Sequence, residues 1–123
     1  MANINLTSAV NKLLKEYGDE INSAVEEVLP KVAKDTVNML KQTSPKRSGA
    51  YAKDWALQKW RTSANYTGVT VFNRGHYHLT HLLEFGHAKR NGGRVPAEPH
   101  IADAEQFAIN ELIAEVERKV KGI

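Results

Sequence analysis

Apolar residues recur at alternating steps of three and four over the first third of the chain, and this pattern constrains the fold more than any other feature. Such spacing places the apolar side chains on one stripe of an α-helix. Residues 1–43 are therefore predicted to form one long amphipathic helix. The stripe consists of Leu6, Val10, Leu13, Leu14, Tyr17, Ile21, Ala24, Val25, Val28, Val32, Ala33, Val37 and Leu40.

Two residues weaken the predicted helix. Pro30 lies inside the pattern and has no backbone N–H to donate, so a kink or a break is expected near Glu27. Gly18 costs about 1 kcal/mol relative to alanine in a helix interior. A helix longer than its own domain needs is expected to pack against a neighbouring subunit. The alternative is a helical hairpin that folds back on itself.

Residues 44–75 are predicted to form a loop followed by a β-hairpin. Pro45 and Gly49 end the helix. Two runs with alternating polarity then follow, and the turn between them contains an asparagine that tolerates a left-handed backbone. The strands are expected at residues 55–60 and 66–72, with the turn at residues 63–65. Because tryptophan buries the most area per residue, Trp55, Trp60 and Phe72 are predicted to cover the face that meets the helices.

The segment from Leu82 to Pro99 is predicted to carry a short helix into a basic loop. Residues 76–86 form the helix, in which Leu82, Leu83 and Phe85 pack around Glu84, and Gly86 ends it in a left-handed conformation. Residues 87–98 have too little apolar surface to order themselves and are predicted to be a flexible loop. Its interaction residues are His87, Lys89, Arg90, Asn91, Gly92, Gly93 and Arg94.

A second amphipathic stripe predicts a C-terminal helix over residues 99–121, with Pro99 suited to its first position. The fold class is therefore α+β: a long N-terminal helix with a possible kink at Pro30, an antiparallel sheet, a short helix, a mobile loop and a C-terminal helix on one sheet face. The 123 residues, of which 41% are hydrophobic, fit a single domain, residues 1–123.

The composition excludes several classes of protein. No run of eighteen apolar residues occurs, and the N-terminus has no secretory signal, so neither a membrane span nor export is expected. The protein is expected to be cytosolic when it is made. The absence of cysteine excludes disulfides, thiolate zinc sites and cysteine nucleophiles. No cofactor, small-molecule substrate or membrane partner is expected.

Positive charge is concentrated in the middle of the chain. The net charge is +3, but residues 44–99 carry nine basic and three acidic side chains, a local charge of +6. This segregation is typical of a surface that meets a phosphate backbone or an acidic partner. Exposed loops that simply carry lysines and arginines are the alternative. A small nucleic-acid-binding protein would use Lys46, Arg47, Arg74, Lys89, Arg90 and Arg94.

Three residues have a spacing that could suit a metal. His78, His81 and Glu84 recur every three residues, so a helix would place them on one face. The set lacks a fourth ligand and the H-E-x-x-H form, and ordinary packing is the alternative to a hydrolytic metal site. Glu84 by itself is predicted to be buried and therefore hydrogen-bonded or paired. Its other conceivable role is general acid or base with His81 or His87.

Three short motifs, taken in order, resemble one known family. They are Pro45 with Ser48, Gly49 and Tyr51; Glu84-Phe85-Gly86; and Pro96 with Pro99-His100-Ile101 and Ala104. Their order and distances are similar to those of the tail completion, or head–tail joining, proteins of long-tailed bacteriophages, a group that includes neck and minor tail proteins. His87, His100 and Asp103 depart from the usual threonine, phenylalanine and proline of that family.

The resemblance implies a structural virion protein of a phage or prophage, with no catalytic activity. Such a protein assembles as a ring, of six subunits, at the head–tail interface or in the tail, after assembly in the host cytoplasm. Its implied partners are copies of itself, the head–tail connector and the tail tube or terminator proteins, with DNA passing through the channel. The motif residues Pro45, Ser48, Gly49, Tyr51, Glu84, Phe85, Gly86, Pro96 and Pro99 would be structural.

Overall fold

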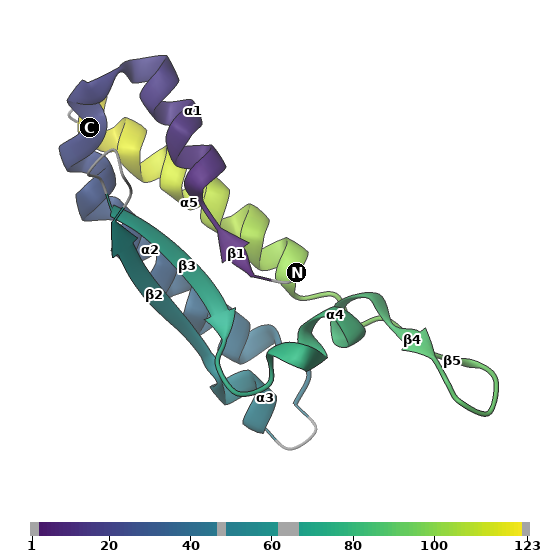
Figure 1. Cartoon of the computed structure of the whole chain (residues 1–123). Coiled ribbons are helices and arrows are strands. Elements are labelled where there is room, and N and C mark those ends of the chain that lie inside the picture. The colour runs from purple at the N-terminus through teal and green to yellow at the C-terminus, as the bar shows by residue number, and fades with distance from the viewer. Residues whose placement is uncertain (1–2, 47–48, 62–66, 122–123) are drawn as a thin grey trace.

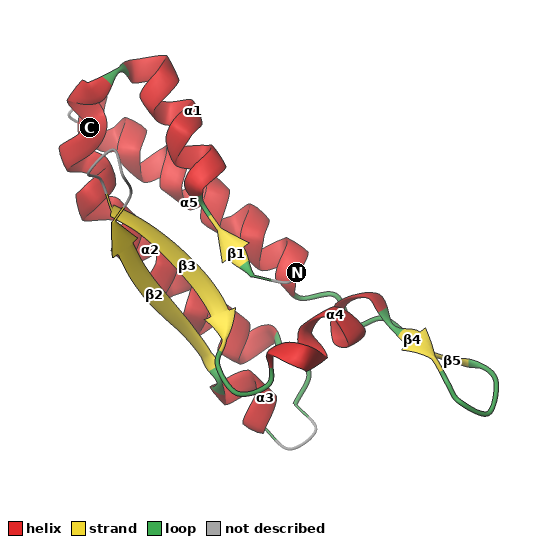
Figure 2. Ribbon diagram, viewed as in Figure 1, coloured by secondary structure: helices red, strands yellow, loops and turns green. Residues whose placement is uncertain are grey.

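A computed structural model describes residues 3–46, 49–61 and 67–121. The described elements form a three-stranded sheet with helices on one side of it and an arm that projects from one end (Figure 1). Helices and antiparallel strands together confirm the α+β class, as Figure 2 shows. None of the described helices is both long enough and apolar enough to cross a membrane.

The N-terminal segment is not one helix. It consists of strand β1 (Ile4–Asn5), helix α1 (Thr7–Tyr17), the 3-10 turn η1 (Asp19–Ile21) and helix α2 (Asn22–Thr43). The chain reverses at Gly18, whose φ of 80° is unstrained only for glycine. Its N–H donates to the carbonyl oxygen of Leu14 at 2.7 Å. The predicted single helix over residues 1–43 is therefore wrong, and the helical hairpin is correct.

Helix α2 continues through Pro30, so the break expected near Glu27 does not occur. Proline has no N–H to donate to the carbonyl of Glu26, so the helix loses one backbone hydrogen bond there. Burial of Val28, Leu29 and Val32 outweighs that single lost bond. The helical segment is therefore interrupted at Gly18 and not at Pro30.

The stripe predicted from the sequence is buried within this one chain. Val10 and Leu13 of α1, Val25 and Leu40 of α2, and Leu112 of α5 (Ile101–Lys121) belong to one core cluster. The hydroxyl of Tyr17 also donates to Glu117 Oε2 at 2.8 Å, joining α1 to α5. Among the described residues, the N-terminal helices are thus not longer than the core they cover, which removes the reason for expecting an overlong helix to pack on a neighbouring subunit.

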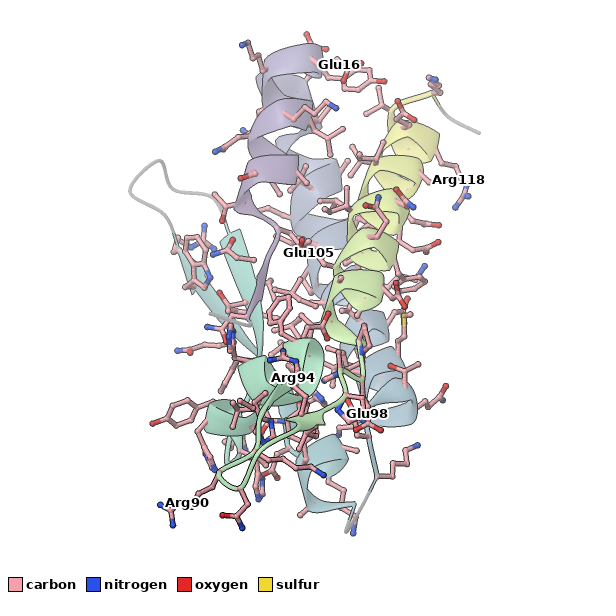
Figure 3. The ribbon with its side chains drawn as sticks, turned by 90° about the vertical axis from the view of Figure 1, so that its right-hand side faces the viewer. Glu16, Arg90, Arg94, Glu98, Glu105 and Arg118 are labelled. Atoms are coloured by element: carbon pink, nitrogen blue, oxygen red, sulfur yellow. The ribbon has the colours of Figure 1, made fainter. Side chains whose placement is uncertain are left out.

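The sheet has the strand order β1-β3-β2, with every pairing antiparallel. Strands β2 (Trp55–Arg61) and β3 (Thr67–Asn73) form the predicted hairpin, and β1 adds to the other edge of β3. The turn predicted at residues 63–65 lies outside the described residues. Helix α2 lies directly against β2 and β3, and α5 packs against α2. Figure 3 shows the three helices on the same side of the sheet.

The two faces of the sheet differ from the prediction. Trp55, Val69 and Val71 are buried against the helices. Trp60 and Phe72 point to the opposite face and are only partly buried, so their predicted place in the core is wrong. Trp60 instead covers Gly68, which it faces across the strands, and its indole N–H donates to Thr70 Oγ1 at 3.1 Å. Period-two alternation from Trp55 would have assigned Trp60 to this outer face.

Candidate interaction site

Helix α4 (Tyr77–Phe85) and a small hairpin after it form an arm, residues 77–95, that projects from the body (Figure 1). The hairpin consists of β4 (His87–Ala88) and β5 (Arg94–Val95). Two hydrogen bonds fix its root: Glu98 N–H to the carbonyl of Leu83 at 2.8 Å, and Arg94 Nη2 to the carbonyl of Phe85 at 3.2 Å. The helix predicted at residues 76–86 is confirmed.

The hairpin replaces the structureless loop predicted for residues 87–98. His87 pairs with Val95 and Ala88 with Arg94. At its turn, Lys89 N–H donates to the carbonyl of Gly93 at 3.0 Å. Gly92 and Gly93 both have positive φ, as tight hairpin turns require. Backbone hydrogen bonds supply the order that apolar burial could not, and the two glycines were the sequence signal for it.

The tip of the hairpin is basic and open to solvent. Lys89, Arg90, Asn91 and Arg94 are exposed. Figure 3 shows Arg90 at the far end of the arm and Arg94 nearer its root. His87 is half-buried, and its Nδ1 atom is buried with no hydrogen-bond partner among the described residues. The predicted interaction residues thus lie together on one hairpin.

Helix α4 adds exposed aromatic surface to the arm. Tyr77 is 68% exposed and Phe85 is 59% exposed. His81, midway between them at four-residue spacing, is also exposed, and its ring centroid lies 4.9 Å from that of Phe85. Phe85 and Leu82, which is 37% exposed, were predicted to pack around Glu84, and this is wrong. Large aromatic side chains left in water are typical of interaction surfaces.

Glu84 fastens the arm to the body. The residue is 5% exposed, and its carboxylate points at the first turn of α5. Oε1 accepts the N–H groups of His100 at 2.7 Å and Ile101 at 2.8 Å, and Oε2 accepts that of Ala102 at 3.0 Å. These donors have no partner within the helix, so Glu84 caps α5 from a distant part of the chain. The predicted burial and hydrogen bonding of Glu84 are confirmed.

The pKa of Glu84 reflects two opposing effects. Burial by itself raises the pKa, because it disfavours the charged carboxylate. The N–H groups of Ile101, His100 and Ala102, together with the His100 ring, favour the charged form and lower the pKa below its ordinary value of 4.5. The first turn of α5 therefore favours the charged form of Glu84.

Tyr51 and His100 lie beside Glu84 where the arm meets the start of α5, a region that we call the junction. The Tyr51 hydroxyl lies 2.8 Å from His100 Nε2, and His100 Nδ1 lies 2.8 Å from the carbonyl oxygen of Glu98. A carbonyl can only accept, so we assign the proton to Nδ1, and Nε2 then accepts from the Tyr51 hydroxyl. Burial, and next the charge of Glu84, raise the pKa of Tyr51, so the hydroxyl keeps its proton.

Replacing Tyr51 with phenylalanine tests this bond. We expect the free energy of unfolding to fall by about 1 kcal/mol, because His100 Nε2 would lose its donor while staying buried. Urea titration followed by tryptophan fluorescence measures the loss, since the Tyr51 ring packs edge-on against Trp55. Tyr77→Phe removes an exposed hydroxyl and serves as the control. Equal stabilities for the two variants would contradict the assigned bond.

The three motifs found in the sequence meet at this junction. Tyr51 comes from the first motif, Glu84 and Gly86 from the second, and His100 from the third. Gly49 has a φ of 83° and precedes α3 (Ala50–Lys53), the short helix that carries Tyr51. His100, noted only as a departure from the family pattern, proves central. Pro45 is half-buried, Pro96 and Pro99 are exposed, and Ser48 lies outside the described residues.

The structure does not assemble the metal candidates. Glu84 is committed to the backbone of α5, whereas His78 and His81 are exposed. Within the described ranges, no group of three or more His, Cys, Asp or Glu side chains is placed to hold a metal ion.

Among the residues predicted to bind nucleic acid, Lys46 Nζ donates to the carbonyl of Gln42 at 2.7 Å, and Arg47 lies outside the described residues.

Comparison with protein families matches residues 8–86 to the model described as "Bacteriophage HK97-gp10, putative tail-component". The matched segment covers more than half of the chain, from α1 to Gly86, and includes α4 but not the hairpin. The chain belongs to the HK97-gp10-like family. This family of bacteriophage tail components agrees with the resemblance seen in the three motifs. No curated protein and no solved structure matches the chain.

Proposed function

We propose that this HK97-gp10-like chain is a structural subunit of the head–tail joint, similar to tail completion or terminator proteins, and that its copies form a ring connecting tail to head. The arm is the observation that carries the proposal. The projecting hairpin exposes Arg90 and Arg94, and α4 exposes Tyr77 and Phe85; arginine and aromatic side chains are enriched in protein interfaces. The proposal includes no catalytic step and no cofactor.

The partners follow from this role. Copies of the chain would contact one another around the ring, with six as the number implied by the resemblance. The head–tail connector would lie on one side and the tail tube or terminator on the other. DNA would pass through the channel, which is compatible with exposed basic residues such as Arg90 without requiring a sequence-specific site.

Native mass measurement over a range of concentrations, alone and with purified tail tubes, tests the proposal. We expect a closed oligomer to form, either by itself or on the tube, and the amides of residues 87–95 to exchange more slowly once it forms. A chain that remains monomeric under both conditions, and binds duplex or single-stranded DNA with steep salt dependence, would contradict the proposal and favour the nucleic-acid-binding alternative.

A further inference from the structure

Opposite charges lie in two successive stretches of the chain, the basic hairpin and the segment that leads into and forms α5. Between Phe85 and Val95 the side chains include three cations, Lys89, Arg90 and Arg94, and no carboxylate. Residues 95–117, which lead into α5 and form most of it, include six carboxylates and no lysine or arginine. These carboxylates belong to Glu98, Asp103, Glu105, Glu111, Glu115 and Glu117.

Four of the six carboxylates have no side-chain hydrogen bond or ion pair with the described residues. Glu115 pairs with Lys31 and Arg118, and Glu117 accepts the hydroxyl of Tyr17. Glu98, Asp103, Glu105 and Glu111 have no side-chain hydrogen bond or ion pair to any described residue. The cations at the hairpin tip likewise form no ion pair with described residues. Figure 3 shows why: Arg90 lies at the end of the arm, far below Glu105 on α5.

We propose that the basic hairpin of one copy docks against the acidic start of α5 in a second copy, where Glu98, just before the helix, and Glu105, within it, bind Lys89 and Arg90. The inference rests on the proposed function and names the contact that would join neighbouring subunits. The two surfaces differ, so the contact is heterologous, and a heterologous contact repeats from copy to copy and forms a ring where the rotation between copies closes.

The same flank of α5 offers apolar surface for the aromatics of the arm. Ala102, Glu105 and Ile109 follow at steps of three and four, so they share one side of the helix. Ala102 is exposed and Ile109 is half-buried. Tyr77 and Phe85 at the base of the arm can therefore bury area against this flank while the charges set the orientation.

Charge reversal and its rescue test the contact. The arm variant is Lys89→Glu with Arg90→Glu, and the helix variant is Glu98→Lys with Glu105→Lys. Each variant is expected to weaken self-association about 30-fold, because attraction between two pairs becomes repulsion. Mixing the two variants, or combining all four changes in one chain, is expected to restore association. Sedimentation velocity at low and high salt measures the effect, and salt should weaken the wild-type contact.

Matched controls reverse charge elsewhere on the surface. Lys12→Glu with Lys15→Glu, and Glu16→Lys with Glu20→Lys, change exposed residues of α1 and η1 by the same amounts. Circular dichroism and the melting temperature verify that all variants fold. Unchanged association of the arm variant, or no recovery when the changes are combined, would overturn the contact even if the wild type forms a ring. A rescued assembly that stops at a dimer would support the contact and contradict the ring.

Discussion

Replacing Glu84 with glutamine is expected to lower the free energy of unfolding by about 2 kcal/mol and the melting temperature by about 8 °C. The amide is almost the same size as the carboxylate, but its NH₂ group is a donor. In the wild type, the N–H groups of His100 and Ile101 face one carboxylate oxygen, and the N–H of Ala102 faces the other. In the variant, the NH₂ group would replace one of these two oxygens and would face a donor. At least one N–H at the start of α5 would be left without a partner, so the helix would lose part of its cap.

The effect should depend on pH in a definite direction. Because folding lowers the pKa of Glu84, the unfolded chain binds its proton more tightly than the folded chain. The stabilisation is then fully present above the ordinary pKa of 4.5 and is lost as pH falls through the lower, folded-state pKa. Denaturant titrations at several pH values should show the gap between wild type and Glu84→Gln closing in acid.

Glu16→Gln is the matched control, since Glu16 is exposed on α1. It should change stability by less than about 0.5 kcal/mol at every pH. A gap between wild type and Glu84→Gln that stayed constant from neutral to acidic pH would show that the charge of Glu84 does not hold α5.

Replacing Gly86 with alanine is expected to cost about 3 kcal/mol. Gly86 has a φ of 72°, which is strained for any residue with a side chain. An added Cβ would also lie 2.5 Å from the carbonyl oxygen of Val95 and 2.8 Å from the nitrogen of Ala97. Both atoms are backbone, so the neighbouring chain must move, and the root of the hairpin with it. Urea titration measures the cost.

Gly92→Ala separates the two causes of that cost. Gly92 has a φ of 92° but no atom within 4 Å of the position an added Cβ would take. Only backbone strain remains, and the loss should be about 1 kcal/mol. Equal losses for Gly86→Ala and Gly92→Ala would mean that close packing at the root of the arm contributes nothing.

The sequence predicted the elements that depend on local periodicity. The α5 helix, the helical character of residues 7–43 and the β2–β3 hairpin follow from side-chain spacing that is visible within a short window. The left-handed Gly86 and the buried Glu84 were predicted as well, because each follows from its immediate neighbours. The stripe of apolar residues could not show that Gly18 reverses the chain, because the same spacing suits one helix or two helices in a hairpin.

The junction could not be derived from local spacing. Tyr51 contacts His100 across 49 positions, and Glu84 caps a helix that begins 17 residues later. Their partners are set by how α3 and α4 meet the N-terminal end of α5, which a periodic pattern does not report. The exposure of Phe85 has the same origin: with Glu84 turned inward, its neighbour at about 100° around the helix faces water.

The reversal at Gly18 has a consequence for the order of assembly. Because α2 returns along α1 after the reversal, the apolar stripe of both helices is buried inside the same chain, so we expect each polypeptide to fold before it meets another copy. Copies would then associate as folded monomers. The association rate would depend on the frequency of their collisions and on their relative orientation, and not on a folding step.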